Sequence, residues 1–363
     1  MLTPDPSALG GVANYYRALD FREVPDGVET FVVNSGARNS TMNVALRLAR
    51  NYLRFWRRIG QDSCRVVVIN PSLTHKSFFR DAVFCWLAHR RRKTTLVFFR
   101  GWAEDFEQQI RKPGLARTVF LHSFARARHF IVLSDTFRQK LLSMGCRLDA
   151  RFWIESTVAD DSHLDDFSID DRLHREGPLR LLFMSRLVAL KGPRLAFDAF
   201  ALAQRSLPPR SIRLAIAGDG PELEPLGKLI KESNLPDASL LGAVSGLAKH
   251  QLLKDSDVLV FPSTYGEGMP NVVLEAMLYG MPVIARNVGA ISDVITHLEN
   301  GFLVEGSQPS AFASCIERLA VDHDLFRNMA RANHEKAARM YTTRAVRARV
   351  RAIFDAVLSS EAG

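Results

Sequence analysis

Short apolar runs alternate with longer amphipathic stretches along most of this sequence. That alternation predicts strands followed by helices, as in βαβ units with parallel sheets, so the expected fold class is α/β. In the first half of the chain, the expected strands are residues 30–34, 65–70, 94–100, 129–134 and 151–154, and the expected helices are residues 11–18, 41–58, 77–92, 117–127 and 136–144. Gly145 follows the last of these helices, where glycine is a favoured residue for ending a helix.

The alternation stops between residues 155 and 177, where the sequence is acidic, poor in apolar residues and closed by Gly177-Pro178. It then restarts, with expected strands at 180–185, 213–218, 238–241, 258–261, 282–286 and 301–304, and expected helices at 193–206, 221–233, 246–255, 270–280, 291–296, 309–322 and 324–341. We therefore expect an N-terminal doubly wound domain of residues 1–176, a second one of residues 177–342, and a closing helical segment of residues 343–363. A ligand is expected in the cleft between the carboxyl ends of the two sets of strands.

The start of the N-terminal domain departs from this pattern. Only Met1 to Ala8 precede the glycine pair Gly10-Gly11, and Pro4 and Pro6 disfavour a strand there. We expect the first strand to be incomplete, through truncation or a mis-set start, which would weaken the N-terminal sheet and the activity.

The net charge of +9 is concentrated in one part of the chain. Residues 51–150 hold 19 Lys and Arg against 7 Asp and Glu, whereas residues 177–363 hold 21 against 19. Such a basic half suits an anionic partner, which can be a membrane surface, a phosphorylated acceptor or nucleic acid, although a solvated basic surface fits equally well. The expected helix 77–92 combines apolar residues with a basic cluster at 89–93, and this combination slightly favours docking on anionic lipid. Its apolar residues are Phe78, Phe79, Val83, Phe84, Trp86 and Leu87.

Cysteine usage and hydropathy bear on the location of the protein. Cys64, Cys85, Cys146 and Cys315 are scattered and form no CxxC pair, which indicates buried thiols in a reducing compartment. No signal-peptide pattern is visible, and no apolar stretch approaches the roughly 20 residues of a spanning helix. We expect a cytoplasmic protein, with peripheral attachment to the inner face of the cytoplasmic membrane as an extension of that expectation.

The segment from Gly266 to Glu275 carries the strongest chemical signal. An apolar run ends at Phe261, a loop with two glycines follows, and Pro270 stands where a helix is expected to begin. Such a loop brings backbone N–H groups to a helix N-terminus, where an anion binds readily. The two carboxylates of Glu267 and Glu275 flank this gap, and carboxylates accept hydrogen bonds from sugar and ribose hydroxyls.

Two further strand ends carry suitable groups. Arg186 follows one expected strand and Lys191 precedes the next helix, so that two cations five residues apart could hold a diphosphate and stabilise its departure. A turn at Gly218 follows the next strand, and we interpret it mainly as turn chemistry with some contact to a nucleotide.

These motifs resemble those of the retaining family-4 (group 1) glycosyltransferases, which have the GT-B fold of two Rossmann-like domains facing a cleft, with a C-terminal helix that returns to the N-terminal domain. Residues 266–275 are similar to the Glu-x7-Glu signature of that family, and residues 184–192 are similar to its Gly-Arg-Leu…Lys-Gly motif, with Ser185 in place of the glycine. The resemblance assigns the ribose to Glu275 and the donor sugar to Glu267. It assigns catalytic roles to Glu267, Arg186 and Lys191, and donor binding to Gly10, Gly11, Gly218, Gly268, Met269, Pro270, Asn271 and Glu275.

On the acceptor side the resemblance is weaker. Arg100 stands where many relatives carry a histidine, and Ser134 ends a strand that lines the acceptor side in the family. A salt bridge from Arg100 to Glu104 or Asp105 is an equally good interpretation of that arginine. The family has Asn-Gly where this chain has Ser156-Thr157, so nothing is assigned there.

The resemblance implies transfer of a sugar, with retention of configuration, from a UDP- or GDP-linked donor to a glycan or lipid-linked acceptor. The implied context is bacterial surface polysaccharide synthesis (exopolysaccharide, capsule or lipopolysaccharide), by a front-face mechanism without a metal or cofactor. Asp255-Ser256-Asp257 is interpreted as helix capping and solvation rather than as a metal site.

Two alternatives stay open: a sugar-nucleotide epimerase, hydrolase or phosphorylase of the same fold, and a non-catalytic membrane- or nucleic-acid-binding protein. Nucleic acid is not an expected partner, since no RRM, KH or zinc pattern occurs. A dinucleotide oxidoreductase is disfavoured because no Gly-x-Gly-x-x-Gly follows a first strand.

Overall fold

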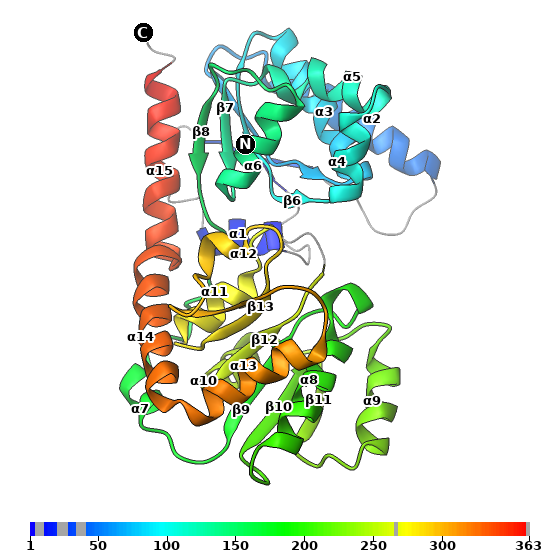
Figure 1. Cartoon of the computed structure of the whole chain (residues 1–363). Helices are drawn as coiled ribbons and strands as arrows, with labels where there is room; N and C mark the ends of the chain where they lie inside the picture. Colours follow the sequence, from blue (N-terminus) through cyan, green and yellow to red (C-terminus); the bar gives the residue numbers. More distant parts are fainter. Residues whose placement is uncertain (4–10, 20–27, 34–40, 265–267, 361–363) are drawn as a thin grey trace. The chain divides into compact units, whose positions relative to one another are not determined.

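The structure, a computed structural model, describes residues 1–3, 11–19, 28–33, 41–264 and 268–360 (Figure 1). Contacts divide the chain into two compact units. Unit 1 comprises Met1–Thr157 and Arg344–Gly363, and unit 2 comprises Val158–Thr343. The C-terminal helix α15 (Thr343–Ser359) therefore groups with the N-terminal part of the chain, as the sequence predicted.

Unit 1 is built on a parallel sheet of four strands in the order β3-β5-β7-β8. The strands are β3 (Val66–Ile69), β5 (Thr94–Phe98), β7 (His129–Val132) and β8 (Arg151–Ile154). Its helices are α1 (Gly11–Leu19), α2 (Thr41–Arg58), α3 (His75–Arg90), α4 (Glu104–Arg111), α5 (Leu115–His122) and α6 (Asp135–Met144), with a 3-10 turn η2 at Phe124–Arg126. Two short strands, β4 (Ser72–Leu73) and β6 (Gly101–Trp102), pair beside the main sheet. Gly145 ends α6 in the left-handed conformation, as predicted.

The first strand is short rather than absent. Leu2–Thr3 form β1, which pairs in parallel with β2 (Phe31–Val32). The side-chain amide of Asn70, just after β3, donates to the Leu2 carbonyl at 2.7 Å and joins this strand to the main sheet region. The expected incomplete strand thus consists of two paired residues, and residues 4–10 lie outside the described part of the chain.

Unit 2 is a six-stranded parallel sheet in the order β11-β10-β9-β12-β13-β14. Numbered from the start of the unit, this is the doubly wound order 3-2-1-4-5-6. The strands are β9 (Leu179–Met184), β10 (Ile212–Ala217), β11 (Ala238–Gly242), β12 (Val258–Phe261), β13 (Val283–Arg286) and β14 (Gly301–Val304). The helices are α7 (Ile169–Leu173), α8 (Pro193–Ser206), α9 (Leu223–Glu232), α10 (Gly246–Asp255), α11 (Asn271–Leu278), α12 (Ile291–Val294), α13 (Pro309–Val321) and α14 (His323–Met340), and a 3-10 turn η3 covers Ala189–Lys191.

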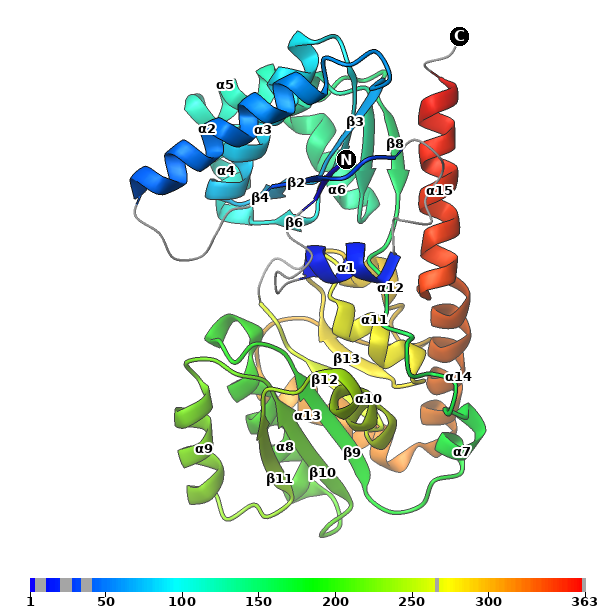
Figure 2. The same cartoon turned by 180° about the vertical axis from the view of Figure 1, so that it is seen from behind.

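Helices cover both faces of this sheet, as Figures 1 and 2 show from opposite sides. The main core lies between the sheet and the helices α8 and α13, where Phe183, Phe200, Phe312 and Ile316 are fully buried. A sheet buried on both faces explains why its strands read as continuous apolar runs in the sequence. All six strands fall within a residue or two of their predicted places.

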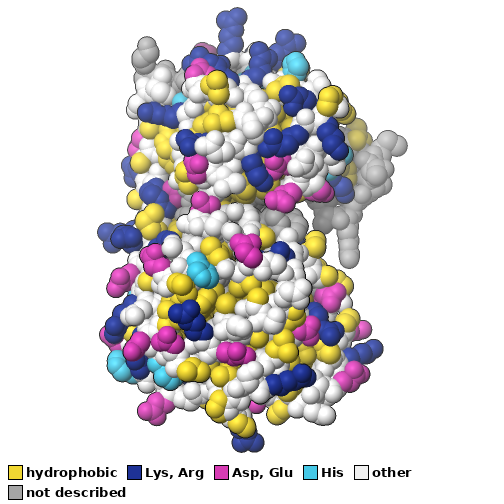
Figure 3. All heavy atoms as spheres, viewed as in Figure 1, with side chains coloured by type: hydrophobic (Ala, Val, Ile, Leu, Met, Phe, Trp, Pro, Cys, Tyr) yellow, Lys and Arg dark blue, Asp and Glu magenta, His cyan; other side chains and the backbone are white. Residues whose placement is uncertain are grey.

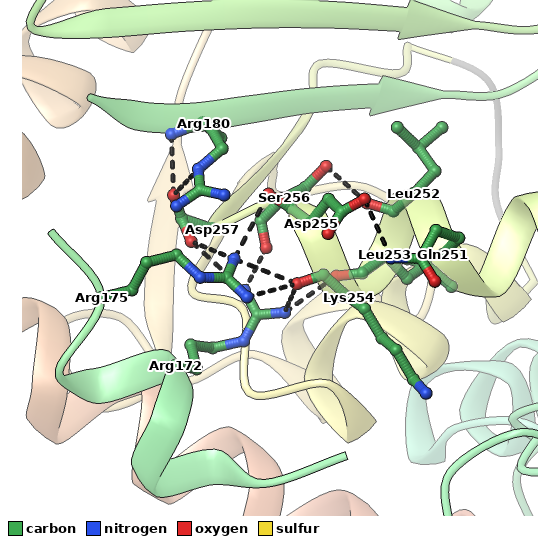
Figure 4. Close-up of polar contacts among 10 residues, drawn as sticks. All are labelled: Arg172, Arg175, Arg180, Gln251, Leu252, Leu253, Lys254, Asp255, Ser256 and Asp257. Atoms are coloured by element: carbon green, nitrogen blue, oxygen red, sulfur yellow. Dashed lines mark hydrogen bonds and ion pairs between the residues drawn. The ribbon is translucent and has the colours of Figure 1, made fainter. Parts of the chain in front are cut away.

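The boundary between the units falls between Thr157 and Val158, not at the predicted position of 176–177. The reason is a cluster of three arginines around Asp257 (Figure 4). The guanidinium of Arg172, on α7, is fully buried and donates to the backbone carbonyls of Leu253, Lys254 and Ser256 at the C-terminal end of α10. These bonds attach the acidic segment before β9 to unit 2. The low apolar content of that segment gave no sign of this attachment.

Asp257 is consequently not the solvated residue that we expected. Its carboxylate lies 3.6 Å from Arg172, 3.4 Å from Arg175 and 3.2 Å from Arg180, and it accepts the Arg180 backbone N–H at 2.9 Å. Burial lowers the pKa of Arg172 to about 10, an effect that Asp257 opposes. Asp257 therefore serves to compensate buried positive charge, and only its neighbour Ser256 caps a helix.

The cysteines meet the sequence expectation in part. Cys85 and Cys146 are buried, whereas Cys64 and Cys315 are half-buried, and all four are free thiols. Burial raises the pKa of Cys146 to about 12 and that of Cys315 to about 11. Such thiols are poor nucleophiles at neutral pH.

Candidate donor site of unit 2

The candidate site lies where the strand order of unit 2 reverses. Strand β9 has β10 on one side and β12 on the other, so the chain leaves the carboxyl ends of β9 and β12 toward opposite ends of the sheet. In open α/β sheets, ligands bind at this switch point. The predicted segments after β9, β10 and β12 therefore meet at one edge of the sheet.

Direct contacts join the loop after β9 to the loop after β12. The backbone N–H and the hydroxyl of Thr264 both donate to the Leu190 carbonyl, at 2.8 and 3.1 Å. Gly192 has a positive φ of 74°, and a Cβ at this position would lie 2.8 Å from the Pro262 carbonyl oxygen. Glycine is thus required for this close approach, which brings Lys191 beside the carboxyl end of β12.

The two predicted cations differ in their surroundings. Arg186 is exposed in the loop after β9. Lys191 is 8% exposed at the end of η3, with its ammonium 5.9 Å from the centre of the Phe261 ring. A lysine held against the last residue of β12 is a fixed charge at the strand end, whereas Arg186 is a mobile one, because a long exposed side chain samples many rotamers.

Gly218 is placed against the same loop. Its φ is 148°, and an added Cβ would stand 1.8 Å from the Ser185 carbonyl oxygen. The Leu187 N–H donates to the Asp219 carbonyl at 2.8 Å, which holds the loops after β9 and β10 together. The structure places Gly218 in this turn, in keeping with our interpretation of it as mainly turn chemistry.

The helix of the strongest motif begins one residue later than predicted. Pro270 is the N-cap residue, with a ψ of 123°, and Asn271 is the first residue of α11. The Gly268 carbonyl accepts the Ala290 N–H at 3.2 Å, and Met269 is buried, so this end of the loop is anchored. The first N–H groups of a helix have no acceptor within it, which leaves the backbone N–H groups of Asn271 and Val272 suited to an anion. Glu267 lies outside the described residues.

Glu275 is more deeply placed than a residue on an open helix face. It is 7% exposed, and its Oε1 is 3.1 Å from the ammonium of Lys249 on α10. The same ammonium lies 2.9 Å from Oδ2 of Asp160, which also contacts Nε2 of His250 at 3.1 Å. Burial raises the pKa of Glu275, and the charge of Lys249 opposes that rise.

Three of the predicted site residues, Gly10, Gly11 and Ser134, belong to unit 1. Gly10 lies outside the described residues, and Gly11 is the first residue of α1. The buried hydroxyl of Ser134 accepts the Phe137 N–H at 3.1 Å and caps α6. Capping α6 explains why a serine stands at this position, so Ser134 gives no separate sign of contact with an acceptor.

Arg100 follows β5 and is 9% exposed. Its guanidinium carbon lies 3.6 Å from the ring centres of both Tyr15 and Phe98. The Nε and Nη2 groups have no hydrogen-bond partner among the described residues, and no ion pair there joins Arg100 to Glu104 or Asp105. The alternative salt bridge is therefore absent from the described part of the chain. Glu104 instead lies 3.7 Å from Lys140.

No group of three or more His, Cys, Asp and Glu residues that could hold a metal ion occurs among the residues that the structure describes. Across the same residues, no helix is both long enough and apolar enough to span a membrane.

Sequence reasoning missed Lys249 and Asp160. Lys249 is one of two lysines on α10, and Asp160 is one of several acids in the segment that we assigned to the other domain. Neither has a local signal, since only the packing of α10 against α11 and the segment 158–164 brings them to Glu275.

Comparison with known proteins shows what the part of the chain that carries this site is similar to. Residues 165–337 match the family model described as glycosyl transferases group 1. Over 159 residues the chain is 34% identical to a D-inositol 3-phosphate glycosyltransferase of Pseudarthrobacter chlorophenolicus, covering 43% of this chain and 38% of that relative. Over 231 residues it is 26% identical to the putative colanic acid biosynthesis glycosyltransferase WcaL of Salmonella typhimurium, covering 61% and 55%. The aligned part thus spans less than two thirds of these curated relatives.

Solved structures extend the likeness to the whole chain. HepE of Anabaena in complex with UDP aligns with a TM-score of 0.74 over 99% of both chains, at 18% identity. A sucrose-phosphate synthase from Thermosynechococcus elongatus aligns with a TM-score of 0.72 over 99% of both chains, also at 18% identity. The fold of this protein is therefore GT-B, as the sequence predicted. Within that fold, residues 165–337 are the part that matches the glycosyl transferases group 1 family model.

Proposed function

We propose that the protein transfers a sugar from a nucleoside diphosphate sugar to a glycan or lipid-linked acceptor with retention of configuration. The observation that carries this proposal is the meeting of three strand-end loops at the switch point of unit 2, around Lys191 and the N-terminus of α11. A fixed cation and a helix N-terminus suit a diphosphate, and a buried carboxylate suits a ribose diol.

Each part has a stated task in the reaction. Lys191 and the backbone N–H groups of Asn271 and Val272 would hold the diphosphate and stabilise the charge that develops on it as the sugar leaves. Arg186 would close on the same phosphates from its exposed position. Glu275 would accept hydrogen bonds from the ribose hydroxyls, and Glu267 would orient the donor sugar. No metal or cofactor enters this proposal.

The biological setting is also a proposal. WcaL is described as a putative colanic acid biosynthesis enzyme, and another relative, AmsK of Erwinia amylovora, as an amylovoran biosynthesis glycosyltransferase. HepE was solved with UDP-glucose bound. These relatives support synthesis of a bacterial surface polysaccharide, with a UDP- or GDP-linked sugar as the donor.

The donor assignment is tested by thermal shift with UDP, GDP and ADP, followed by transfer assays. We expect one diphosphate to raise the melting temperature of the wild type. Lys191→Ala and Glu275→Ala should each reduce transfer by about a hundredfold or more, as loss of a charged transition-state contact does. Arg194→Ala serves as control, because it removes an exposed cation that pairs only with Asp198.

Full transfer activity in a folded Glu275→Ala protein would contradict the assignment. Release of the nucleoside diphosphate at the same rate without any acceptor would favour the hydrolase alternative over transfer.

Arg100 is our candidate for the acceptor side. A buried guanidinium whose Nε and Nη2 lack described partners is costly unless an anion completes it. An acceptor with a phosphate or carboxylate would do so. In the same assays, Arg100→Lys should therefore lower transfer while the thermal shift with the nucleoside diphosphate is unchanged, and an equal loss of both would contradict an acceptor role.

Peripheral attachment to an anionic membrane is proposed for unit 1. Figure 3 shows Lys and Arg side chains gathered over the part of its surface in view. On α2 and α3, the exposed apolar residues Leu53 and Trp86 accompany these charges, and the Arg90 guanidinium lies 5.1 Å from the Trp86 ring centre. Phe78 and Phe84, which the sequence placed among the lipid-facing residues, are instead buried in the core.

A further inference from the structure

We propose that Lys249 is a positioning residue for Glu275, which keeps that buried carboxylate ionised and oriented for the ribose of the donor. The inference rests on the proposed function, since it concerns the group that would bind the nucleotide. It assigns a task to a residue that none of the sequence motifs contains.

Glu275 and Lys249 form a close pair between two helices. Glu275 lies in the fifth position of α11, and Lys249 in the fourth position of α10. The Nζ–Oε1 distance of 3.1 Å is that of a charge-assisted hydrogen bond, and the two side chains are 18% and 9% exposed. The ammonium therefore holds one oxygen of the carboxylate, and the backbone N–H of Asp160 also bonds to this carboxylate.

Lys249 also stands between two carboxylates. Its Nζ contacts Asp160 Oδ2 at 2.9 Å as well as Glu275 Oε1. Without the ammonium, the buried Glu275 carboxylate would lie near the like charge of Asp160, whose side chain is 42% exposed, and a neighbouring like charge raises the pKa of a carboxyl group. The pKa of Asp160 is depressed well below its ordinary range, because its contacts with Ser162, Lys249 and His250 outweigh the effect of burial. Removal of Lys249 would therefore favour protonation of Glu275, which is the more buried of the two carboxylates.

The pair is itself fixed in place. His250 joins Asp160 at 3.1 Å and the hydroxyl of Tyr279 at 2.9 Å, and that hydroxyl contacts the His163 carbonyl at 3.2 Å. The cluster thus links α10, the residue after α11, and the segment 158–164. The titratable and charged groups in and around this cluster, besides Glu275 itself, are Lys249, His250, Tyr279, Asp160, Asp161, His163 and Arg172.

The consequence concerns the ribose. An ionised carboxylate accepts hydrogen bonds from two adjacent hydroxyls, whereas a protonated one has lost part of that capacity. Burial raises the pKa of Glu275, and Lys249 opposes this rise. A protein without the ammonium should therefore bind the ribose poorly near neutral pH and recover as the pH rises through the raised pKa of Glu275.

The test compares UDP with 2′,3′-dideoxy-UDP by calorimetry, with GDP and ADP pairs run in parallel. In Lys249→Met, we expect the affinity for UDP at pH 7 to fall by about tenfold or more, as loss of a hydrogen bond to a charged group does. The affinity for the dideoxy nucleotide should barely change, and the loss for UDP should shrink at higher pH. Lys249→Arg should restore binding, and Lys254→Met, on the same helix, is the matched control.

Equal losses for UDP and the dideoxy nucleotide, without pH dependence, would overturn the inference, because a merely structural lysine would weaken both. Glu275→Gln separates the two proposals. If that variant loses the preference for UDP over dideoxy-UDP while Lys249→Met keeps it, only the positioning role fails. If Glu275→Gln keeps the preference too, the ribose contact of the proposed function fails with it.

Discussion

Gly218 sets the distance between two loops of the candidate site. An added Cβ would meet the Ser185 carbonyl oxygen at 1.8 Å, and the φ of 148° is one that other residues rarely adopt. Gly220 is similar, with a Cβ position 2.4 Å from the Leu187 carbonyl oxygen. At this scale, two glycines without side chains determine where the loop of Arg186 and Lys191 can lie.

Replacing Gly218 should therefore cost both stability and nucleotide binding. We expect Gly218→Ala to lower the free energy of unfolding by about 3 kcal/mol, from backbone strain and a clash with the Ser185 carbonyl. Urea unfolding followed by circular dichroism measures this change.

Gly227→Ala is the matched control for that substitution. Gly227 lies inside α9, where an added Cβ has only an ordinary contact of 3.5 Å with Leu240. Alanine should be neutral there, or stabilising by about 0.5–1 kcal/mol. Equal stabilities of the two variants would contradict the close approach at Gly218.

At the scale of elements, the segment before β9 depends on one buried arginine. Arg172 on the short helix α7 donates to carbonyls in the last turn of α10, and Asp257 compensates its charge (Figure 4). Carbonyls at the end of a helix have no partners within it. Arg172 thus supplies hydrogen-bond partners to the end of α10, and the same bonds hold α7 against α10.

Arg172→Met keeps the apolar stem but leaves these buried carbonyls without a donor. We expect unfolding to become easier by about 3 kcal/mol, as when one partner of a buried ionic cluster is removed. Arg194→Met, which breaks the exposed pair with Asp198, should change stability by less than about 0.5 kcal/mol. A shift in the urea midpoint that is no larger for Arg172→Met would refute this role.

The same element shows what the sequence could and could not reveal. Strands such as β12 and β14 and helices such as α8 and α10 match their predicted ranges, because buried strands and amphipathic helices have clear apolar patterns. The sequence missed α4 and α7, which are short and acidic and bury few residues, among them Phe106, Ile110 and Leu173. Tertiary contacts rather than local periodicity stabilise such helices.

The candidate site divides in the same way. Glycines and a proline at strand ends have local meaning, so the motif around Pro270 was recognisable from the sequence. The ion pair of Glu275 with Lys249 joins residues 26 positions apart on different helices. It follows from packing, which no local pattern encodes.

At the scale of the whole molecule, the charge is unevenly divided. Between residues 51 and 150, Lys and Arg number 19 against 7 Asp and Glu. On α2 and α3 this charge accompanies exposed Leu46, Leu53, Val83 and Trp86. Basic and apolar groups together bind anionic bilayers, and the electrostatic part is screened by salt.

We therefore expect the protein to pellet with phosphatidylglycerol vesicles at low salt and to be released at high salt. Arg90→Glu should weaken this binding, because each basic group near the surface contributes about 1 kcal/mol and the substitution also adds a repulsive charge. Arg205→Glu, on α8 of unit 2, is the charge-matched control. Binding that is insensitive to salt, or equal for phosphatidylcholine vesicles, would contradict an electrostatic attachment.

The two places where the chain passes between the units are adjacent within unit 2. The Ala159 N–H donates to the Tyr341 carbonyl at 2.9 Å, and the hydroxyl of Thr343 donates to Asp161 at 2.6 Å. The first and last residues of unit 2 are thus joined by hydrogen bonds. In the sequence, unit 2 is inserted into unit 1 at two crossings that lie next to each other in space. A module attached in this way can be exchanged between relatives by joining the chain at Thr157 and Arg344. Under the proposed function, such recombination would change the donor while keeping the unit proposed to hold the acceptor, which offers one route by which a polysaccharide could acquire a different sugar.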